Sequence, residues 1–186
     1  VLRSTHLYKE HAVRHNVCRE RPEIRKWFNT NGIYTSTFDC ISKILQFDND
    51  GDKALVVAEP TLVEVAEREC EDVVPLYYPM AKAAPQELTP EAFYNGMVAA
   101  WTGGNIGTIS NKITKIFNSS DPDIDAVKIL CMINNFVIDY AKTLYKVTVP
   151  KDWEKRLAAF DRQKLPAFFK YAKCKSDSQI TARGNN

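Results

Sequence analysis

Three aspartates in one short segment have the residue types and the spacing of a site for a hard divalent cation. The segment 47–52 reads Phe-Asp-Asn-Asp-Gly-Asp, which places carboxylates at positions i, i+2 and i+4. On an extended chain these positions share one face, and the glycine lets the backbone turn so that all three can converge. Converging carboxylates repel one another unless a cation lies among them. Asp48, Asp50 and Asp52 are therefore candidate metal ligands.

Two other interpretations of this segment remain open. A turn rich in Asp, Asn and Gly would use the same side chains to hydrogen-bond the local backbone. A calcium-binding EF-hand loop has ligands at positions 1, 3, 5 and 12 and a glycine at position 6. Counted from Asp48, the twelfth residue is Glu59, but the sixth is Lys53. An EF-hand loop also lies between two helices, whereas the residues after this segment predict a strand.

The elements that must position the aspartates are β-type in the first part of the chain. Up to about residue 84, β-branched and aromatic runs alternate with turn signals. Residues 54–58, Ala-Leu-Val-Val-Ala, form a short apolar run that is typical of a strand buried on both faces. We also expect strands over 32–37 and 73–78, whereas 38–47 fits either a short helix or a strand.

From residue 85 the hydrophobic pattern becomes helical. Thr89 followed by Pro90 predicts a helix start, and Gly103-Gly104 predicts its end near Trp101. Further helices are expected over 105–117, 123–145 and 151–160, with a last turn after Pro166. The 123–145 helix is apolar on every side in its middle and should be the most buried. Residues 176–186 are polar, and we expect them to be a disordered tail.

Composition excludes several classes of protein. Hydrophobic residues make up 45% of the 186 residues and charged residues 26%, as in an ordinary globular protein. No apolar run approaches about 18 residues, so no membrane span is expected. The five cysteines include no CxxC pair, which argues against a zinc ribbon and favours a reducing, cytoplasmic environment. The chain starts without Met or a signal stretch, and we interpret it as an internal segment of a longer protein.

Charge is distributed unevenly along the chain. The overall net charge is +2, but residues 1–30 carry +4, residues 31–141 carry −9 and residues 142–186 carry +7. An acidic centre between basic ends suits a metal site beside a phosphate backbone. Lysine-rich helical surfaces that serve only solubility explain the same pattern equally well.

Five segments together resemble the two-barrel RNA polymerases. Asp-x-Asp-Gly-Asp at 48–52 is the metal-binding signature of that superfamily, which includes the RNA-directed polymerases of RNA silencing and single-chain polymerases of phages. A segment similar to Arg-x-Pro-x-His precedes this signature. Three further segments follow it in the same order as in the silencing enzymes, and they are similar to Leu-Gly-x-Ile-x-Asn, Ala-Val-Asp-Phe-Pro-Lys-Thr and Pro-His-Phe-Met. The matching residues here are 3–7, 104–111, 137–143 and 164–169, with Thr5, Tyr140 and Ala141 as departures.

The resemblance implies an α+β fold. We expect a partial double-psi β-barrel over residues 1–84 that carries the metal-binding loop, a helical region or bundle over 85–175, and the tail over 176–186. Because the superfamily builds its active site between two barrels, a second barrel would come from the rest of a longer chain or from another subunit.

The resemblance also implies template-directed nucleotidyl transfer. Asp48, Asp50 and Asp52 would be the catalytic ligands of one Mg²⁺, and a second Mg²⁺ would arrive with the nucleoside triphosphate. Arg3, His6 and Lys142 would contact substrate. The expected partners are nucleoside triphosphates and a nucleic-acid template and product, with DNA and RNA templates both open. The alternative function is a non-catalytic module that binds calcium or nucleic acid.

Overall fold

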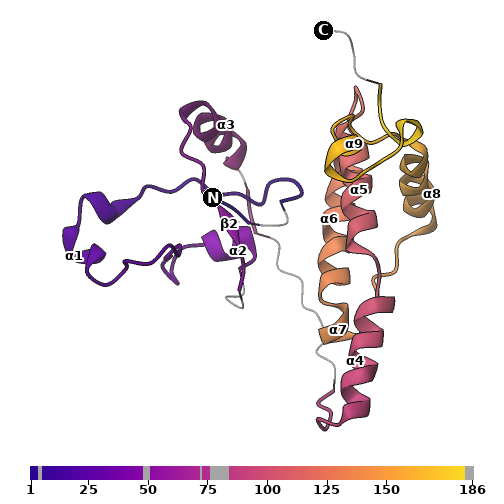
Figure 1. Cartoon of the computed structure of the whole chain (residues 1–186), viewed down its shortest axis with the longest axis horizontal. Helices are drawn as coiled ribbons and strands as arrows, with labels where there is room; N and C mark the ends of the chain where they lie inside the picture. Colours follow the sequence, from indigo (N-terminus) through magenta and orange to yellow (C-terminus); the bar gives the residue numbers. More distant parts are fainter. Residues whose placement is uncertain (4–5, 48–50, 72, 76–83, 183–186) are drawn as a thin grey trace. The chain divides into compact units, whose positions relative to one another are not determined.

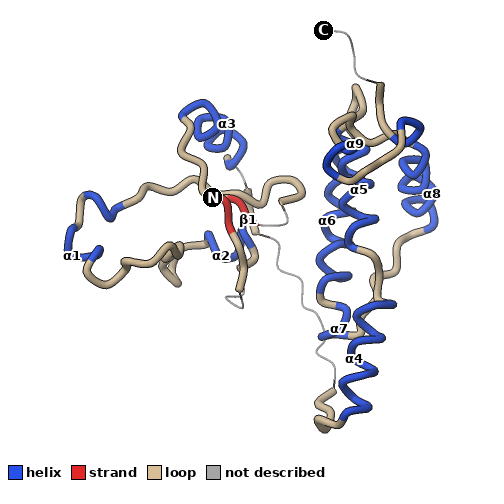
Figure 2. Tube along the Cα trace, viewed as in Figure 1, coloured by secondary structure: helices blue, strands red, loops and turns tan. Residues whose placement is uncertain are grey.

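Helices account for most of the regular structure in the computed structural model (Figures 1 and 2). The structure describes residues 1–3, 6–47, 51–71, 73–75 and 84–182. The chain divides into two units, Val1–Tyr78 and Pro79–Asn186. Among the described residues, no helix is both long enough and apolar enough to cross a membrane.

The first unit holds the only sheet found in the described part of the chain. Strands β1 (Leu2–Arg3) and β2 (Ala54–Leu55) pair antiparallel, with Leu2 opposite Leu55 and Arg3 opposite Ala54. The other elements are helical, and they are η1 (Val17–Arg19), α1 (Pro22–Arg25), α2 (Ile41–Leu45) and α3 (Pro60–Cys70).

The predicted α+β fold with a partial double-psi β-barrel is wrong. The described residues are mostly helical, and their one sheet has two strands of two residues, which cannot close a barrel. The predicted strand over 32–37 has irregular backbone, as do the described residues 73–75 of the third predicted strand. Only the first two residues of the 54–58 run pair with another strand. A β-branched run becomes a strand only when a neighbouring segment accepts and donates its backbone hydrogen bonds, and β1 offers two residues for this.

Helix α3 is the longest described element that the sequence analysis missed. Pro60 occupies its first position, and the Glu59 side chain accepts a hydrogen bond of 2.8 Å from the Leu62 N–H. Both features are helix-start signals.

The core of the first unit is a small apolar cluster, in which Ala12, Ile41 and Leu45 are buried and Val1 and Phe47 pack against them.

The second unit is a set of helices whose starts are capped as their sequences predict. Its main elements are α4 (Pro90–Thr102), α5 (Ile106–Phe117), α6 (Ile124–Ile138), α7 (Tyr140–Thr143) and α8 (Lys151–Ala159). Side chains of Thr89, Asn105 and Asp123 accept hydrogen bonds from the first turns of α4, α5 and α6. Short turns follow α8, namely η2 (Phe160–Arg162), α9 (Phe169–Ala172) and η3 (Asp177–Gln179).

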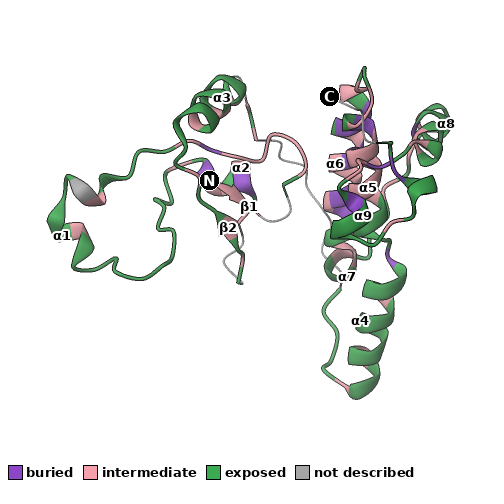
Figure 3. Ribbon diagram, turned by 45° about the horizontal axis from the view of Figure 1, so that its top comes forward, coloured by how far each residue is buried: buried purple, intermediate pink, exposed green. Residues whose placement is uncertain are grey.

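Helix α6 has more buried residues than any other described helix, as expected (Figure 3). They are Ala126, Val127, Leu130, Asn134 and Phe136, whereas α4 buries none. The expected single helix over 123–145 is interrupted, since α6 ends at Ile138 and the short α7 follows.

Residues 176–182, for which the sequence predicts disorder, are attached to the helices. Ile180 forms a parallel bridge with Leu165, and these two side chains form a buried cluster with Phe169. The Leu165 N–H donates to the Gln179 carbonyl over 3.0 Å, and the Thr181 N–H donates to the Leu165 carbonyl over 2.8 Å. Ile180, the one large apolar side chain of this otherwise polar segment, is enough to attach it to the helices.

Two glycines of the α4 region provide a matched test of how α4 and α7 pack. A Cβ added at Gly103 would lie 2.1 Å from Tyr140 Cδ1, whereas one added at Gly96 meets nothing within 4 Å. Gly103→Ala is expected to lower the free energy of unfolding by about 1–3 kcal/mol through overpacking. Gly96→Ala should raise it by about 0.5–1 kcal/mol, because alanine favours the helix. Urea unfolding of both variants measures these effects, and changes of the same sign would contradict this packing.

Candidate metal centre

The aspartate segment is described in part. Asp48 and Asp50 lie outside the described residues, whereas Asp52 lies shortly before β2. Gly51 has a φ of 117°, a backbone conformation that glycine adopts most readily, and a Cβ added there would meet no atom within 4 Å. Among the described residues no group of three His, Cys, Asp or Glu side chains is close enough to hold a metal ion, and this finding leaves out two of the three candidate ligands.

Arg3 and Asp52, two of the candidate site residues, form an ion pair although 49 residues separate them. Arg3 Nη2 and Nε lie 2.9 and 3.0 Å from the same carboxylate oxygen, Asp52 Oδ1. The two side chains are largely shielded from solvent, with 24% and 15% exposed. Pairing of β1 with β2 sets this contact, because Arg3 lies opposite the residue two positions after Asp52.

The same guanidinium group also contacts the other end of the aspartate segment. Arg3 Nη1 donates a hydrogen bond to the backbone carbonyl of Gln46. Gln46 ends α2 with a left-handed φ of 55°, so the chain turns there into the segment. One arginine side chain therefore fastens residues 46 and 52, between which Asp48 and Asp50 lie in the sequence.

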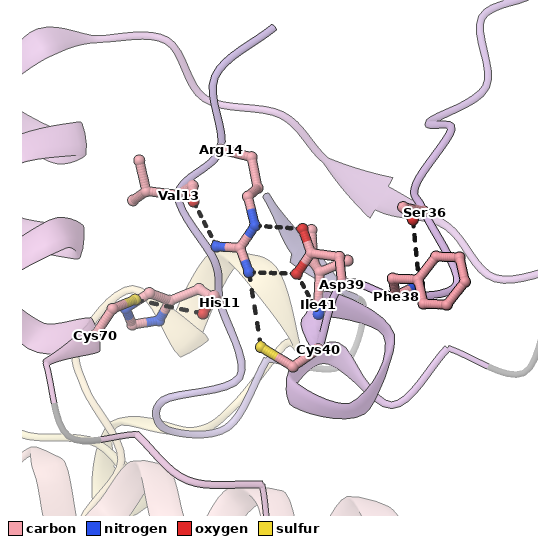
Figure 4. A network of polar contacts seen from close by, with 9 residues as sticks. All are labelled: His11, Val13, Arg14, Ser36, Phe38, Asp39, Cys40, Ile41 and Cys70. Carbon is pink, nitrogen blue, oxygen red and sulfur yellow. Dashed lines mark hydrogen bonds and ion pairs between the residues drawn. The ribbon is translucent and has the colours of Figure 1, made fainter.

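A second arginine anchors the helix that leads into the segment (Figure 4). Arg14 Nε and Nη2 donate to the two carboxylate oxygens of Asp39 over 2.7 and 2.6 Å. Asp39 Oδ1 also accepts the Ile41 N–H at 3.0 Å, at the start of α2. The hydrogen bonds from Arg14, with a smaller contribution from Ile41, lower the pKa of Asp39 from 3.8 to about 2.

This shift predicts a loss of stability in acid. Because the Asp39 pKa is lower in the folded chain than in the unfolded one, the ion pair stabilises the fold above pH 3.8, and this contribution is lost as the pH falls towards 2. Since the pair is partly exposed to solvent, we expect about 1 kcal/mol. Urea unfolding across this range should show a steeper loss for the wild type than for Asp39→Asn. Equal slopes would contradict the role given to Arg14.

His6 lies in the same unit but is paired with another histidine. Its Nε2 is 3.1 Å from Nδ1 of His11. Desolvation lowers the pKa of both rings, and the Glu10 carboxylate opposes this effect. One ring must then donate and the other accept, which requires at least one neutral imidazole.

Lys142 belongs to the second unit and is paired with Asp139 over 3.5 Å, as the i, i+3 spacing predicts. In the same unit the structure brings together two of the segments that carry the resemblance, 104–111 and 137–143. A Cβ at Gly104 would lie 3.0 Å from a Val137 methyl group, and one at Gly103 would lie closer still to Tyr140. Lys142 and the aspartate segment belong to different units.

The flanks of the aspartate segment have one feature of an EF-hand loop, since α2 precedes residues 48–59 and α3 follows them. Glu59, which would close such a loop around calcium, instead caps α3, and hydrogen bonds from backbone N–H groups lower its pKa. Asp52, at the fifth position, is bound by Arg3. A strand follows the segment only as the two residues of β2. The described geometry therefore provides the flanking helices of an EF-hand and lacks its last ligand.

Comparison with known proteins finds an extended similarity to a polymerase. No family model matches the chain, and no solved structure matches it. Over 180 residues, 97% of the chain, it is 47% identical to the DNA-directed RNA polymerase YonO of Bacillus phage SPbeta. The chain spans 21% of the length of that polymerase. Nearly the whole chain is therefore similar to about one fifth of a DNA-directed RNA polymerase.

Proposed function

We propose that this chain is the segment of a DNA-directed RNA polymerase that supplies the metal-binding aspartates. The 47% identity along 97% of the chain to a protein of that name carries the proposal. The Asp-x-Asp-Gly-Asp segment supports it independently, because three converging carboxylates at this spacing favour a cation among them. The reaction would be attack of a 3′-hydroxyl on the α-phosphate of a nucleoside triphosphate, with pyrophosphate as the leaving group.

The residues present fit Mg²⁺. Asp48, Asp50 and Asp52 offer the carboxylate oxygens that Mg²⁺ prefers, and the glycine among them has the backbone conformation and the open space of a sharp turn. Bound there, Mg²⁺ would supply a positive charge that lowers the pKa of the 3′-hydroxyl and stabilises the charge that develops on the phosphate. The role of the chain is to hold the three carboxylates, and Arg3 keeps Asp52 in place for this purpose.

The other candidate residues and partners are part of the same proposal. Arg3, through its remaining N–H groups, His6 and Lys142 would contact the nucleotide or the nucleic acid. The template would be DNA, as in the name of the similar polymerase. The superfamily places the groups that bind the triphosphate on a second barrel. Here those groups would come from the other four fifths or so of such a polymerase or from another subunit. We expect the 186-residue chain alone to be inactive.

Template-directed RNA synthesis by the complete polymerase tests this function. Synthesis should require Mg²⁺ and a DNA template, and it should fail when Asp50 is replaced. A complete protein that binds calcium through this segment but incorporates no nucleotide on either DNA or RNA would overturn the proposal in favour of the calcium-binding module.

A further inference from the structure

A basic pocket lies within the second unit, between α5 and the chain that follows α8. Its volume is about 370 Å³, which is within the range of ligand sites. Five cationic side chains line it, and Asp161 is the one carboxylate among its described lining residues. The cations are Lys112, Lys115, Arg162, Lys164 and Lys175.

The single carboxylate neutralises only one of these cations. Lys112 Nζ lies 2.8 Å from the Asp161 carboxylate. Lys115 Nζ donates to the backbone carbonyl of Asp161, also over 2.8 Å, and a carbonyl carries no net charge. Arg162, Lys164 and Lys175 form no ion pair with the described residues. The pocket therefore keeps an excess of positive charge, which favours an anionic ligand.

The backbone around the pocket is held in place before any ligand arrives. Asn118 Nδ2 donates to the Lys164 carbonyl over 3.1 Å and to Thr181 Oγ1 over 2.6 Å. The next residue, Leu165, is fixed by its bridge to Ile180 and by the buried cluster they share. The cations thus project from a fixed frame, so that less conformational entropy is lost on binding.

Gln163 provides an observation that is independent of charge. Its side chain lines the pocket, and its Oε1 atom is buried without a hydrogen-bond partner among the described residues. A buried amide without a partner is costly, and the two ends of a glutamine amide can exchange places to present N–H groups. A polar ligand in the pocket would offer this amide the partner that it lacks.

We propose that this pocket binds a phosphate group of a nucleic-acid backbone. The excess charge is not confined to the pocket, because residues 142–186 carry a net charge of +7. A polyanion that continues beyond the pocket gains more from this field than a single small anion does, because more of its phosphates are neutralised. The inference rests on the proposed function, in that a polymerase must hold template or product, and it assigns that contact to a face distant in sequence from the aspartates.

Two double variants of the 186-residue chain with equal loss of charge test the proposal. Arg162→Gln/Lys164→Gln removes two pocket cations, and Lys151→Gln/Lys155→Gln removes two exposed cations of α8. Fluorescence anisotropy follows binding of a labelled single-stranded RNA and of DNA with the same sequence over a range of salt. The pocket variant should bind about tenfold more weakly and reduce the slope of log K against log salt by about 1.5. The α8 variant should change affinity less than about twofold.

The outcomes that overturn the proposal are distinct. Equal weakening by both variants would mean that diffuse charge, not the pocket, attracts the nucleic acid. If the pocket variant binds as tightly as the wild type, the pocket is not a nucleic-acid binding site. Lys175→Gln, from another part of the lining, should weaken binding in the same direction, and melting temperatures confirm that each variant is folded.

A competition arm separates the sources of phosphate. Inorganic phosphate and a nucleoside triphosphate should displace the RNA only at the ionic strength at which a simple salt also displaces it. Displacement by the triphosphate at far lower concentration, lost in the pocket variant, would assign the pocket to free nucleotide and overturn the backbone assignment. None of these outcomes affects the proposed polymerase function, which is tested by variants of the aspartates that leave the pocket intact.

Discussion

Asp50→Ala in the complete polymerase is expected to reduce RNA synthesis by at least about 10²–10³-fold without unfolding the protein. The middle carboxylate of the segment would be one of three ligands of the catalytic ion, and its removal takes away a charge placed where the reaction develops its own. Because the three carboxylates repel one another without metal, removing one should leave stability unchanged or slightly higher. Primer extension and melting temperature, measured on the same variant, check both parts.

A matched control for Asp50→Ala is available within the segment. Asn49→Ala changes a neighbouring polar side chain that is not a candidate ligand, and it should keep most of the activity. The turn interpretation makes the opposite prediction, because Asp50→Ala would then break local hydrogen bonds and lower stability without a specific effect on Mg²⁺-dependent synthesis. An Asp50→Ala polymerase that is less stable yet active would remove the basis for the catalytic assignment.

The helical half of the chain could be predicted from the sequence, and the first unit could not. Thr89, Asn105 and Asp123 are caps whose effect depends on the next three residues. Strands depend on partners distant in sequence, and the run 54–58 carries no sign that only two of its residues find one. Helix α3 did have a local signal in Glu59 and Pro60. That signal is easily overlooked, because Glu59 also stands at the position of a calcium ligand and follows an apolar run typical of a strand.

The candidate site was predictable in its residue types but not in its connections. The resemblance singled out Arg3 and Asp52 separately, and the structure shows that they bind each other. Nothing local to Asp39 indicates Arg14 as its partner, since 25 residues separate them. The basic pocket combines residues from 108 to 179, and only the fold brings them together.

Arg3→Ala is the second variant for which we expect a large effect, a fall of about 10²-fold in RNA synthesis by the complete polymerase. The variant keeps all three aspartates. It removes the hydrogen bonds that hold the Asp52 carboxylate and the Gln46 carbonyl, the two ends of the segment. A ligand displaced by about 1 Å is enough for such a loss. The Mg²⁺ concentration for half-maximal activity should rise, and Arg3→Lys should restore part of the activity, since it keeps the charge but not the fork of donors.

Arg14→Ala separates this positioning role from a general loss of stability. Like Arg3→Ala, it removes an ion pair of the first unit, here the bidentate pair with Asp39. That pair holds the start of α2 and does not touch the candidate metal ligands. Both variants should lower the melting temperature by similar amounts, because each breaks charged hydrogen bonds that are partly exposed. Only Arg3→Ala should weaken binding of Mn²⁺, used as a spectroscopic substitute for Mg²⁺, when measured by electron paramagnetic resonance on the complete polymerase. If the two variants weaken Mn²⁺ binding equally, the Arg3 contact stabilises the unit and does not position its metal ligand.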